Sequence, residues 1–167
     1  LKALKKDIIF KDVSFKYDGR KDYVFKKINF SIKAGSFISI IGHSGVGKST
    51  LMDLVPRIIE PNDGTIFYDG IDIKNASLNS LRSKIVYVPQ EPFLFNSTII
   101  ENLTYVKNKA THEELWEALK LANADTFVSE LPDKLDTNIG SLGKKMSGGQ
   151  RQRLVLARAF LSNASIV

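Results

Sequence analysis

One glycine-rich segment, Gly42 to Thr50, constrains this 167-residue sequence more than any other feature. It fits the G-x-x-x-x-G-K-[ST] pattern. The preceding run, Phe37 to Ile41, is apolar almost throughout, which predicts a strand covered on both faces within a parallel sheet. After it, apolar residues recur at helical spacing over about Lys48 to Ile58. A buried strand, a loop and a helix in this order predict an α/β fold.

The glycine-rich loop has the chemistry of a polyphosphate site. Gly42, Gly45 and Gly47 let the backbone curl so that consecutive N–H groups point inward, and the helix start adds its positive dipole end. Lys48 supplies a charge near the β- and γ-phosphates, Ser49 a hydroxyl for Mg²⁺, and Thr50 a donor to a phosphate oxygen. A glycine-rich turn that only caps a helix is the simpler alternative, but the flanking strand and helix favour nucleotide binding. We expect no catalytic role for the His43 side chain. Nucleotide contacts are expected from Gly42, His43, Ser44, Gly45, Val46, Gly47, Lys48, Ser49 and Thr50.

The remaining sequence alternates strand and helix patterns. Ile9, Val13, Phe15 and Tyr17 recur at even spacing, as do Ile28, Phe30 and Ile32, which predicts two strands with one wet face each around an Asp18-Gly19 turn. Further strands are predicted at Thr65 to Tyr68, at Ile85 to Val88 as a buried strand, and from Ile166 onward. Helices are predicted at Ser77 to Lys84, after a Thr111/Glu114 capping box, at Ala124 to Leu131 and at Gly149 to Leu161.

Composition and charge exclude several classes of protein. The chain is 43% hydrophobic and 25% charged, as in soluble globular domains. No apolar run is long enough to cross a bilayer, no secretory signal is visible, and the lack of cysteine excludes disulfides and thiolate metal sites. Of the net charge of +6, residues 1–30 carry nine basic against four acidic side chains, and the other residues fifteen against fourteen. The basic excess is local, so we expect no nucleic-acid partner.

A second motif narrows the function, because a phosphate loop alone fits kinases, GTPases, motor ATPases and transporters. Met146-Ser147-Gly148-Gly149-Gln150, followed by Arg151-Gln152-Arg153 and an apolar helix, resembles the signature motif of ATP-binding cassette (ABC) domains. A serine helix cap with flexible glycines would explain Ser147 and Gly148, but not Gln150 and the arginine-rich turn. The resemblance implies that ATP bound by one cassette is closed over by a second, head-to-tail cassette, through Ser147, Gly148, Gly149 and Gln150.

The resemblance extends over essentially the whole chain. Tyr17 matches the aromatic residue that stacks on adenine, and Gln90 matches the glutamine that reaches Mg²⁺ and couples to the membrane part. Without the family resemblance, Tyr17 would be interpreted as an ordinary aromatic residue of a strand and Gln90 as a surface turn residue. The implied catalytic residues are thus Lys48 and Gln90, and the implied metal contacts are Ser49 and Gln90. Phe93 to Ile99, Glu101-Asn102 and Thr137 to Gly143 resemble exporter-type cassettes, although Ser141 stands where exporters commonly have Glu and Met146 replaces the usual Leu.

The family resemblance implies an α/β fold: a P-loop NTPase (RecA-like) core with an antiparallel β subdomain and an α-helical subdomain. Residues 1–167 would be a partial ABC nucleotide-binding domain. Its expected parts are the antiparallel β region at 7–35 and 64–70, the P-loop strand and helix at 36–60, the helical subdomain at 102–145, and the signature motif and helix at 146–161.

The resemblance also implies a function. We expect the domain to bind MgATP and, when complete and dimerised, to hydrolyse it to power export through attached transmembrane domains at the cytoplasmic face of a membrane. The family next has a strand ending in Asp and a catalytic Glu, whereas this sequence stops at Val167. We therefore expect a C-terminally incomplete domain that binds ATP without hydrolysing it, and that is poorly stable or self-associated when alone.

Two alternatives stay open at this level. One is a soluble ABC-type ATPase that acts on DNA or ribosomes, and the other is an ATP-sensing interaction module. The exporter-like Phe95 to Thr98 stretch argues against the first. The cargo stays open between lipid, lipid-linked sugar, peptide and drug.

Overall fold

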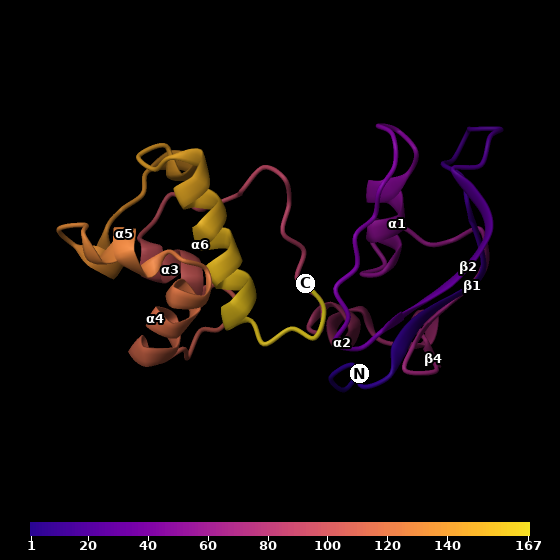
Figure 1. Ribbon diagram of the computed structural model, residues 1–167, viewed down its shortest axis with the longest axis horizontal. Coiled ribbons are helices and arrows are strands. Elements are labelled where there is room, and N and C mark those ends of the chain that lie inside the picture. Colours follow the sequence, from indigo (N-terminus) through magenta and orange to yellow (C-terminus); the bar gives the residue numbers. More distant parts are fainter. The chain divides into compact units, whose positions relative to one another are not determined.

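A computed structural model describes the backbone of residues 1–167 and all side chains except that of Leu142. The chain divides into two compact units (Figure 1). We call them the sheet unit, which comprises Leu1–Ile85 with Ile166, and the helical unit, which comprises Val86–Ser165 with Val167. Across the described residues, none of the helices combines the length and the hydropathy needed to cross a bilayer.

An antiparallel sheet forms the frame of the sheet unit. Its strands follow the order β2-β1-β3-β4 and are β1 (Asp7–Phe15), β2 (Phe25–Lys33), β3 (Asp63–Tyr68) and β4 (Ile71–Asp72). Ile8 lies opposite Ile32 of β2 and Tyr68 of β3, so β1 is central. The two alternating segments at the start of the sequence are therefore strands, as predicted.

A bulge in β1 changes which side chains face the core. The register against β2 shifts between Phe10 and Val13, and Asp12 has a φ of 51°. The extra residue resets the alternation, so that Ile8 and Phe10 are buried on the same side as Val13 and Phe15. The prediction that Ile9 lies on the same strand face as Val13 is therefore wrong, because Ile9 precedes the bulge and is only half-buried.

Gly64 on β3 faces this bulge at close range. A Cβ atom built on Gly64, whose φ is +83°, would lie 2.3 Å from the carbonyl oxygen of Asp12. Only glycine fits this approach, so the bulge and Gly64 act as one feature.

Short helices cover the buried face of the sheet. They are α1 (Lys48–Leu54), α2 (Leu78–Arg82) and a 3-10 turn at Ile73–Asn75. Leu54, Ile73 and Leu81 join the strand residues in one buried cluster. Helix α1 ends four residues before the predicted Ile58, because Pro56 has no N–H to donate to the carbonyl of Met52 and Arg57 takes a left-handed φ of 53°.

Two predicted buried strands are absent from the described residues. Residues 37–41 form no strand, and Phe37 and Ile41 are 97% and 91% exposed. Of residues 85–88, only Ile85 pairs, in an isolated parallel bridge with Ile166. A strand inside a parallel sheet needs a hydrogen-bonded neighbour on each side, and the described sheet is antiparallel with no strand beside residues 37–41. These two strand predictions are wrong, and the bridge at Ile166 is the only pairing at the predicted last strand.

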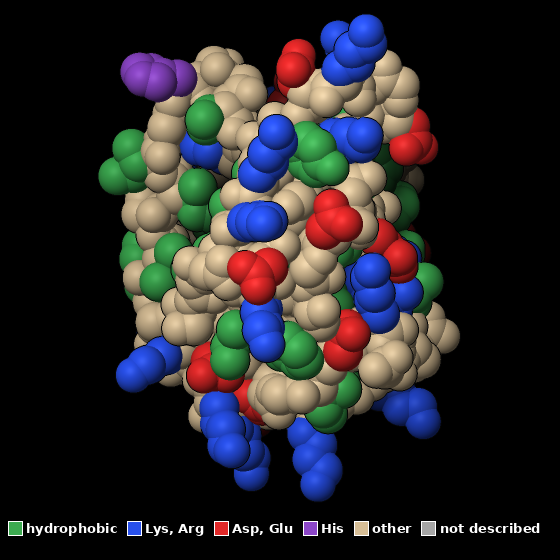
Figure 2. Space-filling model, turned by 90° about the vertical axis from the view of Figure 1, so that its right-hand side faces the viewer, with side chains coloured by type: hydrophobic (Ala, Val, Ile, Leu, Met, Phe, Trp, Pro, Cys, Tyr) green, Lys and Arg blue, Asp and Glu red, His purple; other side chains and the backbone are tan. Residues whose placement is uncertain are grey.

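Figure 2 shows how basic and acidic side chains are distributed on one face of the molecule. Lysine and arginine side chains there are interspersed with aspartate and glutamate, as on an ordinary solvated surface. The expected lack of a nucleic-acid partner stays a prediction.

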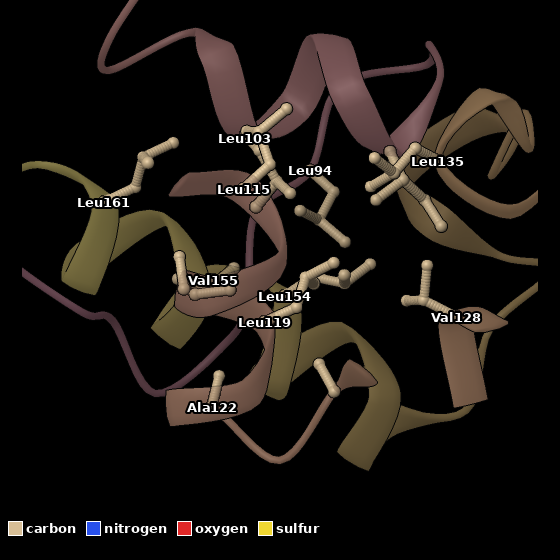
Figure 3. Packing of buried hydrophobic residues seen from close by; sticks show 14 of the residues in the cluster. Leu94, Leu103, Leu115, Leu119, Ala122, Val128, Leu135, Leu154, Val155 and Leu161 are labelled. Carbon is tan, nitrogen blue, oxygen red and sulfur yellow. The ribbon is translucent and has the colours of Figure 1, made fainter. Parts of the chain in front are cut away.

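Four helices pack around one core in the helical unit: α3 (Ile99–Thr104), α4 (His112–Leu121), α5 (Asp125–Ser129) and α6 (Gly148–Leu161), with 3-10 turns at Lys134–Asp136 and Ser141–Gly143. Leu115 and Leu119 of α4 converge with Leu154 of α6 (Figure 3). The predicted stripe of Leu154, Ala157 and Leu161 is buried, and the predicted Thr111/Glu114 capping box is present.

Candidate nucleotide-binding site

The glycine-rich loop lies at the surface of the sheet unit and leads directly into α1. Residues 42–46 are exposed, and the amide of Val46 donates to the carbonyl of His43 at 3.3 Å. Gly47 precedes α1 with a φ of 99°, and a Cβ atom on it would lie 2.3 Å from Cγ1 of Val24. The start of β2 therefore packs against the loop and leaves room only for glycine.

Lys48 holds its ammonium over the loop. Its Nζ donates to the carbonyl oxygens of Gly42 and His43, both at 2.8 Å. These partners are neutral, the loop contains no acidic residue, and no ion pair involves Lys48 among the described residues. The positive charge is thus fixed beside exposed backbone amides without a carboxylate to neutralise it, which suits a polyanionic ligand.

Tyr17 meets the other end of the motif. Its hydroxyl lies 2.8 Å from Oγ1 of Thr50, in the first turn of α1. The Phe15 ring supports the Tyr17 ring edge-on, with centroids 4.9 Å apart and planes at 85°. The fold therefore places a half-exposed aromatic ring next to the loop, although Tyr17 and Thr50 are 33 positions apart in the sequence.

The residues of the loop fit a magnesium-bound triphosphate. The loop offers exposed amides, one ammonium and the exposed hydroxyl-bearing Ser49. In the part of the chain that the structure describes, no cluster of three or more His, Cys, Asp or Glu side chains could hold a metal. A divalent ion here would therefore depend on Ser49 and on the oxygens of the phosphates themselves.

Gln90 lies in the helical unit, whereas the loop belongs to the sheet unit. It is exposed and follows Pro89 in a segment without helix or strand. Its expected contact with Mg²⁺ stays a prediction.

The second motif forms the N-terminus of α6. Oγ of Ser147 accepts from the amide of Gln150 at 3.2 Å, and Oε1 of Gln150 accepts from the amide of Ser147 at 2.9 Å. This reciprocal capping box gives Gln150 a structural role. The expectation from the sequence that a serine helix cap cannot explain Gln150 is therefore wrong. Arg151 also has a local partner, the carbonyl of Met146 at 3.3 Å.

The cap leaves an anion-binding tip exposed. Because the Ser147 oxygen accepts from Gln150, the hydroxyl proton of Ser147 remains available to a ligand. Ser147, Gly148 and Gly149 are all exposed at the start of a 14-residue helix. Exposed amides and a helix dipole favour negative charge there.

A buried polar contact that the sequence did not reveal joins α3 to α6. Asn102 is 1% exposed, and its side-chain oxygen accepts from the amide of Phe95 at 2.8 Å and from Arg158 at 2.9 Å. Its amide group donates to Phe95 O, Ser97 Oγ and Thr98 O. Burial lowers the pKa of Arg158, although Tyr105 acts in the opposite direction. The sequence signal was an asparagine inside a helix turn next to a capping box, Thr98 with Glu101.

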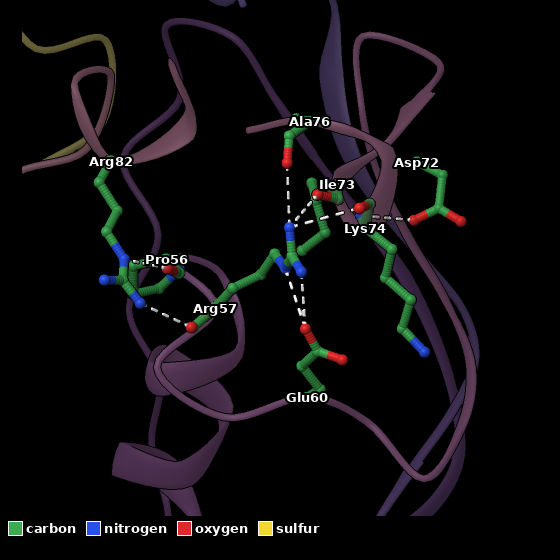
Figure 4. A network of polar contacts seen from close by, with 8 residues as sticks. All are labelled: Pro56, Arg57, Glu60, Asp72, Ile73, Lys74, Ala76 and Arg82. Carbon is green, nitrogen blue, oxygen red and sulfur yellow. Dashed lines mark hydrogen bonds and ion pairs between the residues drawn. The ribbon is translucent and has the colours of Figure 1, made fainter. Parts of the chain in front are cut away.

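A second network of polar contacts, which is partly exposed to solvent, holds the end of α1 (Figure 4). Arg57, with a φ of 53°, pairs with Glu60 at 2.7 Å and donates to the carbonyls of Ile73 and Ala76, both at 3.0 Å. Arg82 donates to the carbonyls of Pro56 at 3.0 Å and Arg57 at 2.8 Å. The helix that begins at the glycine-rich loop is thus anchored at its far end.

Comparisons with known proteins agree on one family. Residues 25–167 match the family model described as ABC transporter. An uncharacterized ABC transporter ATP-binding protein of Bacillus subtilis, YwjA, is 48% identical over 99% of this chain and 28% of its own length. An ATP-dependent lipid A-core flippase of Desulfotalea psychrophila is 46% identical over 100% of this chain and 29% of its own. A heavy metal tolerance protein of Schizosaccharomyces pombe is 44% identical over 100% and 20%.

The fold comparison points the same way. A bacterial Atm1-family ABC exporter solved with ATP bound superimposes with a TM-score of 0.91 at 38% identity, covering 98% of this chain and 28% of that one. The chain thus spans less than a third of the length of these relatives.

Proposed function

The chain belongs to the ABC transporter family, and we propose that its glycine-rich loop binds the triphosphate of MgATP in an exporter-type cassette. The observation that carries the proposal is the ammonium of Lys48, fixed at 2.8 Å from two loop carbonyls beside exposed amides and without an acidic partner. Ser49 and Gln90 would contact Mg²⁺, and the Tyr17 ring would face the base. The metal's contribution is to neutralise phosphate charge.

The partner of this site is a second cassette. In a head-to-tail pair, the exposed tip of one copy, Ser147 to Gln150, would close over the phosphates held by the other. The free hydroxyl proton of Ser147 and the exposed amides of Gly148 and Gly149 support this role. Closure of such a pair around ATP is a population shift that nucleotide binding drives.

Export is the process that this binding would power. The relatives include a lipid A-core flippase and an Atm1-family exporter. We propose that transmembrane domains hold the cassette at the cytoplasmic face of a membrane and that hydrolysis resets it. The division of residues 1–167 into a β region, a P-loop part, a helical subdomain and a signature helix belongs to this proposal.

Residues 1–167 alone would bind ATP without turning it over. The family resemblance assigns the base that activates water to a glutamate after the signature motif, and residues 148–167 contain no Asp or Glu. Phosphate release by this chain should therefore match that of Lys48→Ala.

The experiment that tests the proposal is calorimetric titration of the chain with MgATP. We expect saturable binding that Lys48→Ala weakens by roughly ten- to a hundredfold, the size of charge-assisted hydrogen bonds. Lys33→Ala, which removes an exposed lysine from the same unit, is the matched control and should bind as the wild type does. Equal affinity of the wild type and Lys48→Ala would contradict the proposal.

A further inference from the structure

The hydrogen bond between Tyr17 and Thr50 suggests a second role for Tyr17, apart from its ring. We propose that the Tyr17 hydroxyl orients the hydroxyl of Thr50 toward the phosphates, so that Tyr17 is a positioning residue for the triphosphate as well as a surface for the base. The inference rests on the proposed function of the loop, because it concerns the same ligand. It assigns a task to an atom, the phenol oxygen, that base stacking does not use.

The two hydroxyl groups meet in a well-defined geometry. Thr50 is 6% exposed, and its Oγ1 lies 2.8 Å from Oη of Tyr17. Tyr17 is 47% exposed, so its ring reaches from the solvent to a buried hydroxyl. The contact therefore joins the open part of the site to the start of α1.

The backbone around Tyr17 is held on both sides. The amide of Lys16 donates to Oδ1 of Asn62 at 2.6 Å, and the amide of Arg20 donates to the carbonyl of Tyr17 at 3.0 Å. With the Phe15 ring edge-on against its own, Tyr17 has little freedom to turn its hydroxyl away from Thr50.

Counting donors gives the hydrogen bond a direction. Each hydroxyl has one proton and two acceptor positions, and the oxygens of a triphosphate only accept. If Thr50 donates its proton to a phosphate oxygen, it can only accept from Tyr17. The phenol must then donate, which forms a chain from Tyr17 through Thr50 to the phosphate, and such chains strengthen each member.

The chain separates the hydroxyl of Tyr17 from its ring. A phenylalanine at position 17 keeps the ring and removes only the donor. Inorganic tripolyphosphate carries the phosphates and no base, so a residue that acts only by stacking cannot affect its binding. Loss of tripolyphosphate affinity on Tyr17→Phe is therefore specific to the proposed relay.

The experiment titrates magnesium tripolyphosphate into the wild-type chain, Tyr17→Phe, Thr50→Val, the double variant, Thr50→Ser and Lys48→Ala. We expect Tyr17→Phe to weaken binding about fivefold, the size of one neutral hydrogen bond. Tyr17→Phe should have no further effect in the Thr50→Val background, and Thr50→Ser should bind as the wild type does. Tyr23→Phe, on the same hairpin, is the control and should bind normally. Thermal unfolding curves verify that each variant is folded.

Two results would overturn the inference while leaving the proposed function intact. One is tripolyphosphate binding by Tyr17→Phe at wild-type affinity, and the other is an equal loss from Tyr17→Phe in the Thr50→Val background. If the wild-type chain binds tripolyphosphate with no dependence on Lys48, the proposed function itself fails, and the inference fails with it.

Discussion

Replacing Asn102 by alanine tests how the helical unit is held together. The side chain of Asn102 makes five hydrogen bonds, at 2.8 to 3.1 Å, within a site that is almost closed to solvent. Alanine would remove all five and leave the amide of Phe95 and one nitrogen of Arg158 without this acceptor. Each buried donor left unsatisfied costs about 1–3 kcal/mol, so we expect a loss of about 4 kcal/mol in the free energy of unfolding.

The single tryptophan makes the measurement specific to this unit. Trp116 lies on α4 and packs against the same core, so its fluorescence during urea unfolding reports on the helical unit. With an m-value of about 1.5 kcal/mol per molar, the urea midpoint should fall by roughly 2–3 M. Asn108→Ala, an exposed asparagine of the same unit, is the control and should change stability by less than about 0.5 kcal/mol.

Asn102→Asp separates the accepting contacts from the donating ones. The carboxylate keeps the two accepting contacts, to Phe95 and Arg158, but its second oxygen takes the place of the donating nitrogen and faces the carbonyl oxygens of Phe95 and Thr98. We therefore expect a loss of stability for aspartate as well, because a buried acceptor then lacks a donor. A loss below about 1 kcal/mol for alanine, or an aspartate variant as stable as the wild type, would refute the reasoning.

Three further predictions concern the sheet unit. In thermal unfolding, Gly64→Ala should destabilise the chain by at least about 2 kcal/mol more than Gly70→Ala. Both glycines have a φ near +80°, but only at Gly64 does a backbone atom, the carbonyl oxygen of Asp12, lie 2.3 Å from the new Cβ. Equal losses for the two variants would show that the bulge does not need glycine. Desolvation, the largest single effect, raises the pKa of Asp69, but the hydrogen bonds from the backbone amides of Lys5, Lys6 and Asp7 together outweigh it and hold this pKa below its usual range. Because the folded pKa is the lower one, the stability advantage over Asp69→Asn should be constant above about pH 4 and should shrink as the pH falls further; an advantage that grows below pH 4 would reverse the assignment. The double variant Phe37→Lys with Ile41→Lys should self-associate less in sedimentation velocity runs, because both apolar side chains are more than nine-tenths exposed. An unchanged distribution of sedimentation coefficients would place the associating surface elsewhere.

The sequence predictions were most accurate where the signal is local. The Thr111/Glu114 capping box and the buried stripe of α6 depend on residues three or four apart, and both are present. The two motifs were informative because their chemistry lies in a few consecutive residues. The family resemblance that they supported is the one that the comparisons show.

Features that depend on distant partners were not predictable in the same way. Residues 37–41 have the composition of a buried strand, yet a strand exists only where a neighbour pairs with it. The bulge at Asp12 becomes visible only through the pairing of β1 with β2 and β3. The contact of Asn102 with Arg158 joins residues 56 positions apart, and their spacing in the sequence carries no pattern. The link from Tyr17 to Thr50 is of the same kind.

The measurement that tests the central claim most directly is a titration of the isotopically labelled chain with MgATP, followed through its backbone amide resonances. If the loop binds the phosphates, the amides of residues 44–50 should shift most, and Lys48→Ala should need roughly ten- to a hundredfold more MgATP for the same shifts. Resonances of residues 44–50 that do not shift, or that shift in Lys48→Ala at the same MgATP concentrations as in the wild type, would contradict the assignment of the triphosphate to this loop.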